Sequence, residues 1–496
     1  MLNARKGADV PTGTSPSTVR RAGKIDRRLP DTNVKTGQIA GKLDEMPGAR
    51  RERVSNQFDQ LDGSTKNHFK NVDGRYNPAS EATDLFENTG PSGRRALNEP
   101  TDSDGEAADV LLRMDDAATQ WRFTKAYESD AVDSDELGTA LRRYDGLDSD
   151  GKAEYRRFTE TTGNDGVGFV TDLNSDQVSD FFGSACRRAP SVAAPPRFRS
   201  DRLHSVAQHD TLALTAGGCA DDLSALAKQR YYNNIADAAS ENSDISASEI
   251  FDQVEDVSDA DRRRTLKQLF ADSGEDGIRL ARDMDSGTKE AFLDLGTDNQ
   301  FGTFNRFDDW RSNVAKSGVD TAEARRYTER VDRAGDHENI DGAEELVKEV
   351  ADNPTQVPGQ SGEAASALRY ADNTNRVKME PGNGEYDLAV TRGGDTEYVE
   401  VKTRTRDDVT ENWVRGKITD INEKFESAQE NGLDIGDRPS DGDSVLELRV
   451  PGDSSDLDDV RSTVQNAIED RNTVHADEIR IVTESGATEI ITNPNQ

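Results

Sequence analysis

The stretch Tyr386-Asp-Leu-Ala-Val-Thr-Arg-Gly-Gly-Asp-Thr-Glu-Tyr-Val-Glu-Val-Lys-Thr403 has the pattern of a β-hairpin. Aliphatic and polar residues alternate on both sides of a turn, Arg392-Gly-Gly-Asp395. Side chains in a strand alternate between two faces. Val399 and Val401 should therefore point to one face. Glu400 and Lys402 should point to the other. The hairpin is therefore predicted to present charged side chains on one face of a sheet.

The segments around this hairpin predict a small α/β domain over residues 363–496. Its expected helices are Glu363–Asn373, Asn412–Glu430 and Leu457–Asp470, and its expected strands are Arg376–Glu380, Tyr386–Val390, Thr396–Thr403, Ser444–Val450 and Glu478–Glu484. The order is α-β-β-β-α-β, followed by α-β. Residues 351–362 are rich in Pro and Gly, which predicts a linker in front of the domain.

Residues 107–350 are predicted to form a duplicated α-helical region. Thr162–Ser175 aligns without a gap on Ser273–Ser286, with Gly, Asp-Gly, an aliphatic residue, Asp and Ser in register. Three segments, which begin at Asp133, Ser246 and Asp320, place a capping side chain three residues before a Glu. The simplest interpretation is a repeated unit that serves as a scaffold or spacer.

Residues 1–106 consist largely of Gly, Pro, Ser, Thr, Asn and charged residues. Hydrophobic residues appear too sparse there to repay the entropy of ordering, so we expect a disordered or loosely helical segment. A short helix is expected at Arg50–Leu61, because Val54, Phe58 and Leu61 share one face.

The window from Ser184 to Gly218 is rich in Arg, Ala, Pro and His and poor in carboxylates. Three interpretations stay open: a loop between the repeat copies, a segment out of its native reading frame, and a zinc site. The zinc ligands would be Cys186, His204, His209 and Cys219, although structural zinc sites usually bring their ligands in close pairs.

The charge and the hydropathy pattern bear on habitat and location. A formal net charge of -35, with Arg commoner than Lys, is typical of proteins adapted to molar salt, where screening makes charge repulsion cheap. No apolar stretch follows the pair Arg20-Arg21, and nowhere do 18 apolar residues run together. The sequence therefore favours a cytoplasmic protein without a membrane span, with secretion by an unrecognised route left open.

Three residues of the C-terminal domain combine into a candidate hydrolytic site. Asp387 and Glu400 lie on adjacent predicted strands and supply the hard oxygen ligands that Mg²⁺ or Mn²⁺ prefers. Lys402 shares a face with Glu400, so its ammonium can orient a water molecule and offset negative charge. A basic run follows, with side chains suited to phosphate contacts: Arg404, Arg406, Arg415, Lys417 and Lys424.

With its element order, this pattern resembles the PD-(D/E)xK nuclease superfamily, whose fold is the restriction-endonuclease-like αβββαβ core. Asp387 matches the motif's Asp, Glu400 and Lys402 match its Glu-x-Lys, and Glu363 matches the helix glutamate that many members add. Gly384-Glu-Tyr stands where the name-giving Pro is found. The resemblance implies a metal-dependent endonuclease that uses these four residues in catalysis and binds Mg²⁺ or Mn²⁺ through Asp387 and Glu400.

The overall arrangement resembles haloarchaeal polymorphic toxins, in which a small C-terminal domain is the toxic part. That resemblance implies DNA or transfer RNA as the substrate and an immunity protein as a partner. Two alternatives remain. One is a restriction or repair endonuclease, and the other is a catalytically inactive domain that binds nucleic acid or serves as a protein-interaction scaffold.

Overall fold

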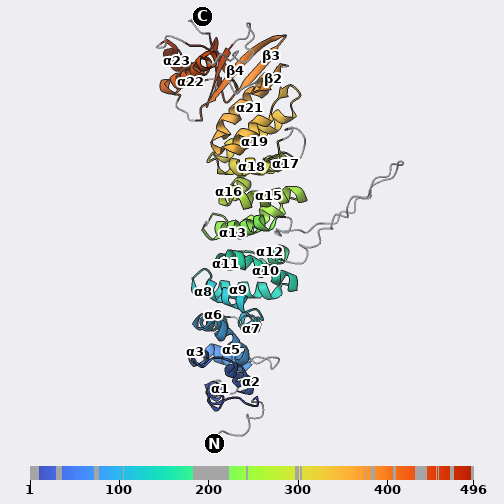
Figure 1. Ribbon diagram of the computed structural model, residues 1–496, viewed down its shortest axis with the longest axis vertical. Coiled ribbons are helices and arrows are strands. Elements are labelled where there is room, and N and C mark those ends of the chain that lie inside the picture. Colours follow the sequence, from blue (N-terminus) through green and yellow to red (C-terminus); the bar gives the residue numbers. More distant parts are fainter. Residues whose placement is uncertain are drawn as a thin grey trace, which may run out of the picture. The chain divides into compact units, whose positions relative to one another are not determined.

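The computed structural model describes residues 11–28, 36–71, 78–103, 105–182, 223–241, 244–296, 301, 304–373, 375–380, 386–405, 409–430, 444–453, 455, 457–469 and 474–492 (Figure 1). The chain divides into two compact units, Met1–Glu275 and Asp276–Gln496. The described residues of the first unit form helices, whereas those of the second combine helices with one seven-stranded sheet. The window 184–218, and with it the four candidate zinc ligands, lies outside the described residues.

Most helices of the chain are short, between 8 and 17 residues, apart from the 20-residue α22. Those of the first unit are α1 (Pro16–Arg28), α2 (Thr36–Glu45), α3 (Gly48–Asp59), α4 (Gly63–Asn71), α5 (Pro78–Thr89), α6 (Pro91–Ser103), α7 (Gly105–Arg113), α8 (Ala117–Glu128), α9 (Ser134–Gly146), α10 (Ser149–Thr162), α11 (Asn164–Asp172), α12 (Ser175–Phe182), α13 (Ala225–Glu241), α14 (Ala247–Glu255) and α15 (Ala260–Ser273). Those that follow are α16 (Glu275–Asp283), α17 (Ser286–Asp294), α18 (Phe307–Lys316), α19 (Thr321–Asp336), α20 (Glu344–Asp352), α21 (Val357–Ala371), α22 (Glu411–Glu430) and α23 (Leu457–Glu469).

Helices α1 to α6 occupy the segment that was expected to be disordered or loosely helical, so the expected disorder does not extend to its described residues. Their few hydrophobic side chains fall on the faces that meet: Phe58 of α3 and Phe86 of α5 are buried with ring centroids 5.1 Å apart. The helical alternative of that prediction is the one present in the described residues, because a helix that is marginal by itself becomes stable when its apolar face packs on neighbours. The helix expected at Arg50–Leu61 corresponds to α3, and Leu61 is buried just beyond it.

The internal repeat has a local structural counterpart. Helix α10 ends at Gly163 with φ of 65°, and α15 ends at Gly274 with φ of 59°. Both glycines adopt the left-handed conformation that ends a helix at no steric cost, and each is followed at once by a nine-residue helix. The capping boxes predicted at Asp133 and Ser246 are both present, while at Asp320 the side chain accepts from the Glu323 backbone N–H.

The predicted linker, residues 351–362, is helical instead of extended. Asn353 caps a 3₁₀ turn, Pro354–Gln356, through a 3.0 Å hydrogen bond from the Thr355 backbone N–H, and α21 follows directly. Pro358 lies in the first turn of α21, where a helix tolerates proline. Pro and Gly thus start a helix here, and helices α17 to α20 belong to the same compact unit as the sheet.

The sheet contains seven strands in the order β1-β2-β3-β4-β5-β6-β7. They are β1 (Ile340–Asp341), β2 (Arg376–Met379), β3 (Leu388–Arg392), β4 (Asp395–Thr403), β5 (Ser444–Val450), β6 (Glu478–Thr483) and β7 (Thr488–Thr492). Strands β2, β3 and β4 form an antiparallel meander, whereas β4, β5 and β6 run parallel. The predicted order α-β-β-β-α-β, then α-β, is present, and β1 and β7 add a strand at each edge.

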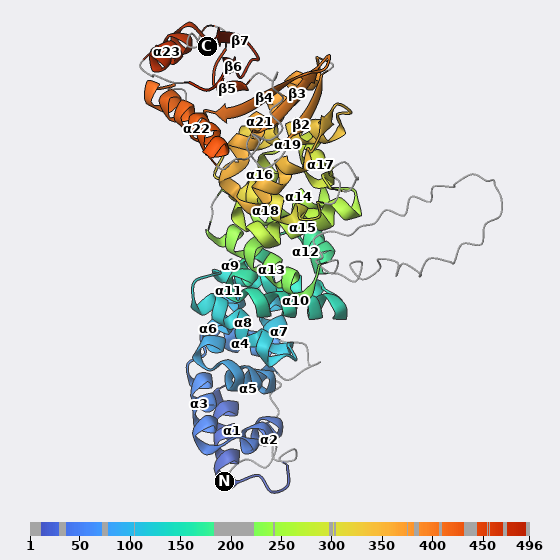
Figure 2. The same ribbon diagram turned by 45° about the horizontal axis from the view of Figure 1, so that its top comes forward.

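Helices cover both faces of this sheet (Figure 2). On one face, Leu446 and Leu448 of β5 join a core that includes Val414 and Ile418 of α22 and Val464 of α23. On the other face, the alternating residues of β5 meet α21, which carries Glu363. None of the described helices combines the length and the hydropathy that a membrane crossing requires.

Candidate functional site

The β3–β4 hairpin sets the position of the candidate site. Gly393 and Gly394 both have positive φ, 57° and 114°, in the two-residue connection that joins the strands. Asp387 lies just before β3, and its Oδ2 accepts a 2.7 Å hydrogen bond from the backbone N–H of Val401 on β4. The candidate aspartate is thereby fixed against the Glu-Val-Lys segment.

Asp387, Glu400 and Lys402 are in contact. The Lys402 Nζ lies 2.5 Å from Glu400 Oε1 and 3.6 Å from Asp387 Oδ2. The Glu400 side chain is fully buried, whereas those of Asp387 and Lys402 remain 18% and 22% exposed, so the cluster opens to solvent on the side of these two residues. Burial lowers the pKa of Lys402, but the charges of Asp387 and Glu400 outweigh it, and its pKa lies above the ordinary value. Lys402 is therefore a firmly charged ammonium between two carboxylates.

Glu363 of α21 lies close enough for these charges to act on it. Its pKa is raised well above the ordinary value, first by burial and then by the negative charges of Asp387 and Glu400, with Lys402 opposing the shift. The Gln360 amide donates a 3.0 Å hydrogen bond to Glu363 Oε1. The four residues predicted to act together thus form one electrostatically coupled cluster.

The described residues contain no group of three or more His, Cys, Asp or Glu side chains set to hold a metal ion. The donor chemistry of the cluster nevertheless fits a hard divalent cation, since it consists of carboxylates from α21, β3 and β4. The raised pKa of Glu363 reflects a crowding of negative charge that Lys402 offsets only in part. Asp387 and Glu400 therefore remain the residues that could hold Mg²⁺ or Mn²⁺.

The predicted basic run does not gather into one free cluster. Arg415 pairs with Glu411, and Lys417 pairs with Asp420 at 2.7 Å, both within α22. Arg404 lies over the ring of Trp413, its Cζ 5.7 Å from the ring centroid. Arg406 and the side chain of Lys424 lie outside the described residues. Two of the predicted phosphate contacts are thus neutralised by neighbouring carboxylates, because the same helix supplies opposite charges three and four residues away.

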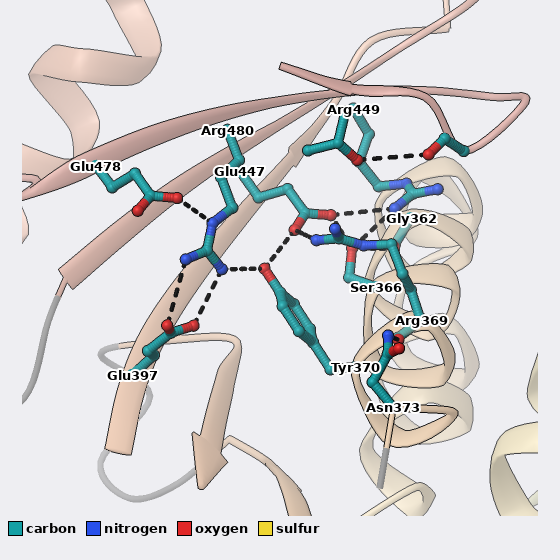
Figure 3. Close-up of polar contacts among 12 residues, drawn as sticks. Gly362, Ser366, Arg369, Tyr370, Asn373, Glu397, Glu447, Arg449, Glu478 and Arg480 are labelled. Atoms are coloured by element: carbon teal, nitrogen blue, oxygen red, sulfur yellow. Dashed lines mark hydrogen bonds and ion pairs between the residues drawn. The ribbon is translucent and has the colours of Figure 1, made fainter. Parts of the chain in front are cut away.

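A buried polar network on the α21 face was not foreseen from the sequence (Figure 3). Glu447 of β5 is fully buried and accepts hydrogen bonds from the Ser366 hydroxyl at 2.6 Å, the Tyr370 hydroxyl at 2.8 Å and Arg449 at 3.0 Å. Arg369 also pairs with Glu447. The attraction of the two arginines, with the hydroxyl donors, outweighs burial and lowers the pKa of Glu447.

Arg480 of β6 extends this network. Its Nη1 donates to the Tyr370 hydroxyl at 2.8 Å and to Glu397 Oε2 at 3.0 Å, and its Nε pairs with Glu478 (Figure 3). The network therefore joins β4, β5 and β6 to the helix that carries Glu363. The sequence feature that could have indicated this network is the alternation of the charged residues Glu447 and Arg449 with aliphatic residues in β5. The structure shows that β5 is buried along its whole length.

No protein-family model matches the chain, and no match is found among curated proteins or among solved structures. Assignment of a function therefore depends on the residues and geometry described above.

Proposed function

We propose that the unit Asp276–Gln496 is a metal-dependent phosphodiesterase, an endonuclease that acts on DNA or transfer RNA. The observation that carries the proposal is the coupled cluster of Asp387, Glu400, Lys402 and Glu363. Its support is chemical. The carboxylates of Asp387 and Glu400 contact the ammonium of Lys402, and this cluster is partly exposed to solvent. The carboxyl group of Glu363, whose pKa is raised, lies close enough to feel their charges. The arrangement of an antiparallel meander followed by parallel β5 is compatible with the restriction-endonuclease-like fold.

Each residue has a distinct task in this proposal. Asp387 and Glu400 would hold Mg²⁺ or Mn²⁺, and the bound ion would polarise the phosphate and neutralise its charge. Lys402 orients the attacking water and stabilises the charge that develops on the phosphate oxygens. Glu363 can accept a proton from that water, because its raised pKa brings its affinity for protons closer to neutral pH.

One alternative has a specific observation in its favour. Lys402 already pairs with both carboxylates, and an ion-pair cluster of this kind is also what an inactive domain of this fold would keep for stability. Such a domain would bind nucleic acid or a protein without cutting. A restriction or repair enzyme and a toxin with an immunity partner share the same chemistry and differ in biological context.

The test uses the full chain with plasmid DNA, single-stranded DNA and transfer RNA, in Mg²⁺, in Mn²⁺ and in chelator. Metal-dependent cutting should fall by about 100-fold or more in Asp387→Asn, since it removes a ligand and transition-state stabilisation. Asp395→Asn, in the exposed hairpin turn, is the matched control and should cut like the native chain. Binding without cutting in every metal would support the inactive alternative. Toxicity on expression that a neighbouring gene relieves would favour a toxin over a repair enzyme.

A further inference from the structure

A pocket of 410 Å³ lies at the carboxyl ends of the parallel strands. Its walls come from the end of β4 and the residues that follow it, from the end of β5, from Glu484 after β6, from residues 318–330 before and within α19, and from the N-terminal half of α21. This edge is where sheets with parallel strands usually bind ligands, because the loops diverge there and leave a crevice. The volume lies within the range of pockets that hold small ligands.

Four arginines from three segments line this pocket: Arg326 and Arg330 of α19, Arg404 after β4, and Arg449 of β5. Arg449 Nη1 is held by Glu447 at 3.0 Å and Ser366 at 3.2 Å, so its guanidinium is fixed in place. Arg330 Nη1 donates to Ser361, to the hydroxyl at 2.7 Å and to the carbonyl at 3.2 Å. The Ser361 groups that accept these hydrogen bonds from Arg330 are neutral, and within the described part of the chain no ion pair joins Arg330 to a carboxylate.

The surroundings of Arg330 favour an anion. Burial lowers the pKa of its guanidinium, the positive charge of Arg449 lowers it further, and the carboxylates of Glu323 and Glu484 oppose the shift. The net lowering means that an anion would stabilise this cation. Arg404 stands at the same wall, where its backbone N–H donates to the Arg449 carbonyl at 2.8 Å. Fixed guanidinium groups that converge on one space match the geometry of phosphate oxygens.

Three carboxylates also line the pocket, and all three are already engaged. Asp320 caps α19 by accepting from the Glu323 backbone N–H at 2.7 Å. Glu323 and Glu484 share Arg326, at 2.6 Å and 3.2 Å. The pocket therefore offers both guanidinium and carboxylate groups, which suits a ligand that carries a phosphate as well as hydroxyl or amino groups.

We propose that this pocket binds a nucleotide through its phosphate, with the phosphate against Arg330, Arg404 and Arg449 and the sugar hydroxyls toward Glu323 and Glu484. The pocket also includes Gly362 and Thr403, the chain neighbours of Glu363 and Lys402, so its occupant lies beside the coupled cluster. Nucleotide binding in this pocket requires no cleavage of the ligand, so the inference does not depend on the proposed phosphodiesterase activity. Free nucleotides and the phosphorylated end of a strand offer the same chemistry.

The experiment is isothermal calorimetry on the full chain in chelator, with a 5′-mononucleotide, the matching nucleoside, and an oligonucleotide with and without a 5′-phosphate. Binding of the nucleotide or of the phosphorylated oligonucleotide, and at least about tenfold weaker binding of the forms without phosphate, supports the site. The two phosphorylated ligands distinguish a free nucleotide from a strand end. Absence of binding by both, or equal binding of nucleoside and nucleotide, would overturn the proposal.

Variants locate the binding in this pocket. Arg330→Gln and Arg404→Gln should each weaken nucleotide binding by about tenfold or more, because each removes a charge-assisted hydrogen bond to phosphate. Arg333→Gln, on the same helix as Arg330, is the matched control: its side chain is 61% exposed and faces Asp372. Arg404 lies just after β4 and outside any helix, so we expect Arg404→Gln to fold even if Arg330→Gln does not. The Arg404→Gln variant then provides the test. Native affinity in a folded Arg330→Gln or Arg404→Gln chain would contradict the proposal.

Discussion

Substitution of Glu447 by Gln should destabilise the C-terminal unit more than any comparable change at its surface. Glu447 is fully buried. Its two carboxylate oxygens accept hydrogen bonds from four side chains, those of Ser366, Arg369, Tyr370 and Arg449. A glutamine keeps the shape but removes the charge and turns one acceptor into a donor. The buried Arg449 and the partly exposed Arg369 would then lose their shared counterion.

The expected cost follows from that burial. Removal of one partner of a buried ion pair costs about 3 to 5 kcal/mol, because the remaining charge stays desolvated. Glu489→Gln is the matched control, since Glu489 pairs with Arg461 at 2.7 Å with side chains 32% and 45% exposed. An exposed pair of this kind contributes about 0 to 1 kcal/mol. The two variants therefore separate by several kcal/mol if burial determines the cost.

The assay is scanning calorimetry of the full chain, with hydrogen exchange of β5 to assign the transition that moves. For a unit of this size, Glu447→Gln should lower Tm by about 6 to 20 °C. The pKa of Glu447 is lowered in the folded state, so its stabilising effect is present above the ordinary carboxyl value of 4.5 and is lost as pH falls toward the lowered pKa. The difference from the native chain should shrink in acid. A neutral-pH loss no larger than that of Glu489→Gln would refute the reasoning.

Three further predictions concern Glu363, the contact of α21 with β4, and the repeated turns. Glu363→Gln should stabilise the metal-free chain at neutral pH by about 1.4 kcal/mol for each unit by which the pKa is raised. A raised folded pKa means that the penalty grows as pH rises above 4.5, so denaturant titrations at pH 4 should show no gain. Gly362→Ala should lower the free energy of unfolding by about 1 to 3 kcal/mol, because the new methyl would lie 1.8 Å from Thr403 Oγ1. The loss should be smaller in a chain that also carries Thr403→Ala. Equal losses in both backgrounds, measured by urea unfolding, would contradict this contact. Gly163→Ala and Gly274→Ala should each cost about 1 to 2 kcal/mol through their left-handed conformation, and clearly unequal costs would argue against equivalent turns.

The sequence predicted those parts of the fold that local patterns specify. Alternation defined β5 at Ser444–Val450 with the bounds that the structure has, and the Gly-Gly turn placed the hairpin. The two-residue β1 escaped detection because two residues carry no periodicity, and it exists only by pairing with β2. The predicted linker failed because Pro is compatible with the first turn of a helix as well as with an extended segment.

The candidate site was predictable only in part for a similar reason. Asp387, Glu400 and Lys402 lie on one hairpin, so their contact follows from strand register. The partners of Glu447 on α21 lie 77 to 81 residues away along the chain, and no local pattern indicates that separation. The arginine pocket likewise joins residues from α19 to β5. Its members become a set only when the chain folds.

The most direct test of the central proposal compares two lysine substitutions in the same sheet, Lys402→Gln and Lys378→Gln. The full-length variants are incubated with DNA and transfer RNA in Mg²⁺ and in Mn²⁺, and strand cleavage is measured beside the native chain. Lys378 lies on β2 with an exposed side chain and is not a member of the coupled cluster. We expect metal-dependent cleavage that Lys402→Gln abolishes and Lys378→Gln retains. Cleavage that persists in Lys402→Gln, or a native chain that cuts neither substrate in either metal, would contradict it.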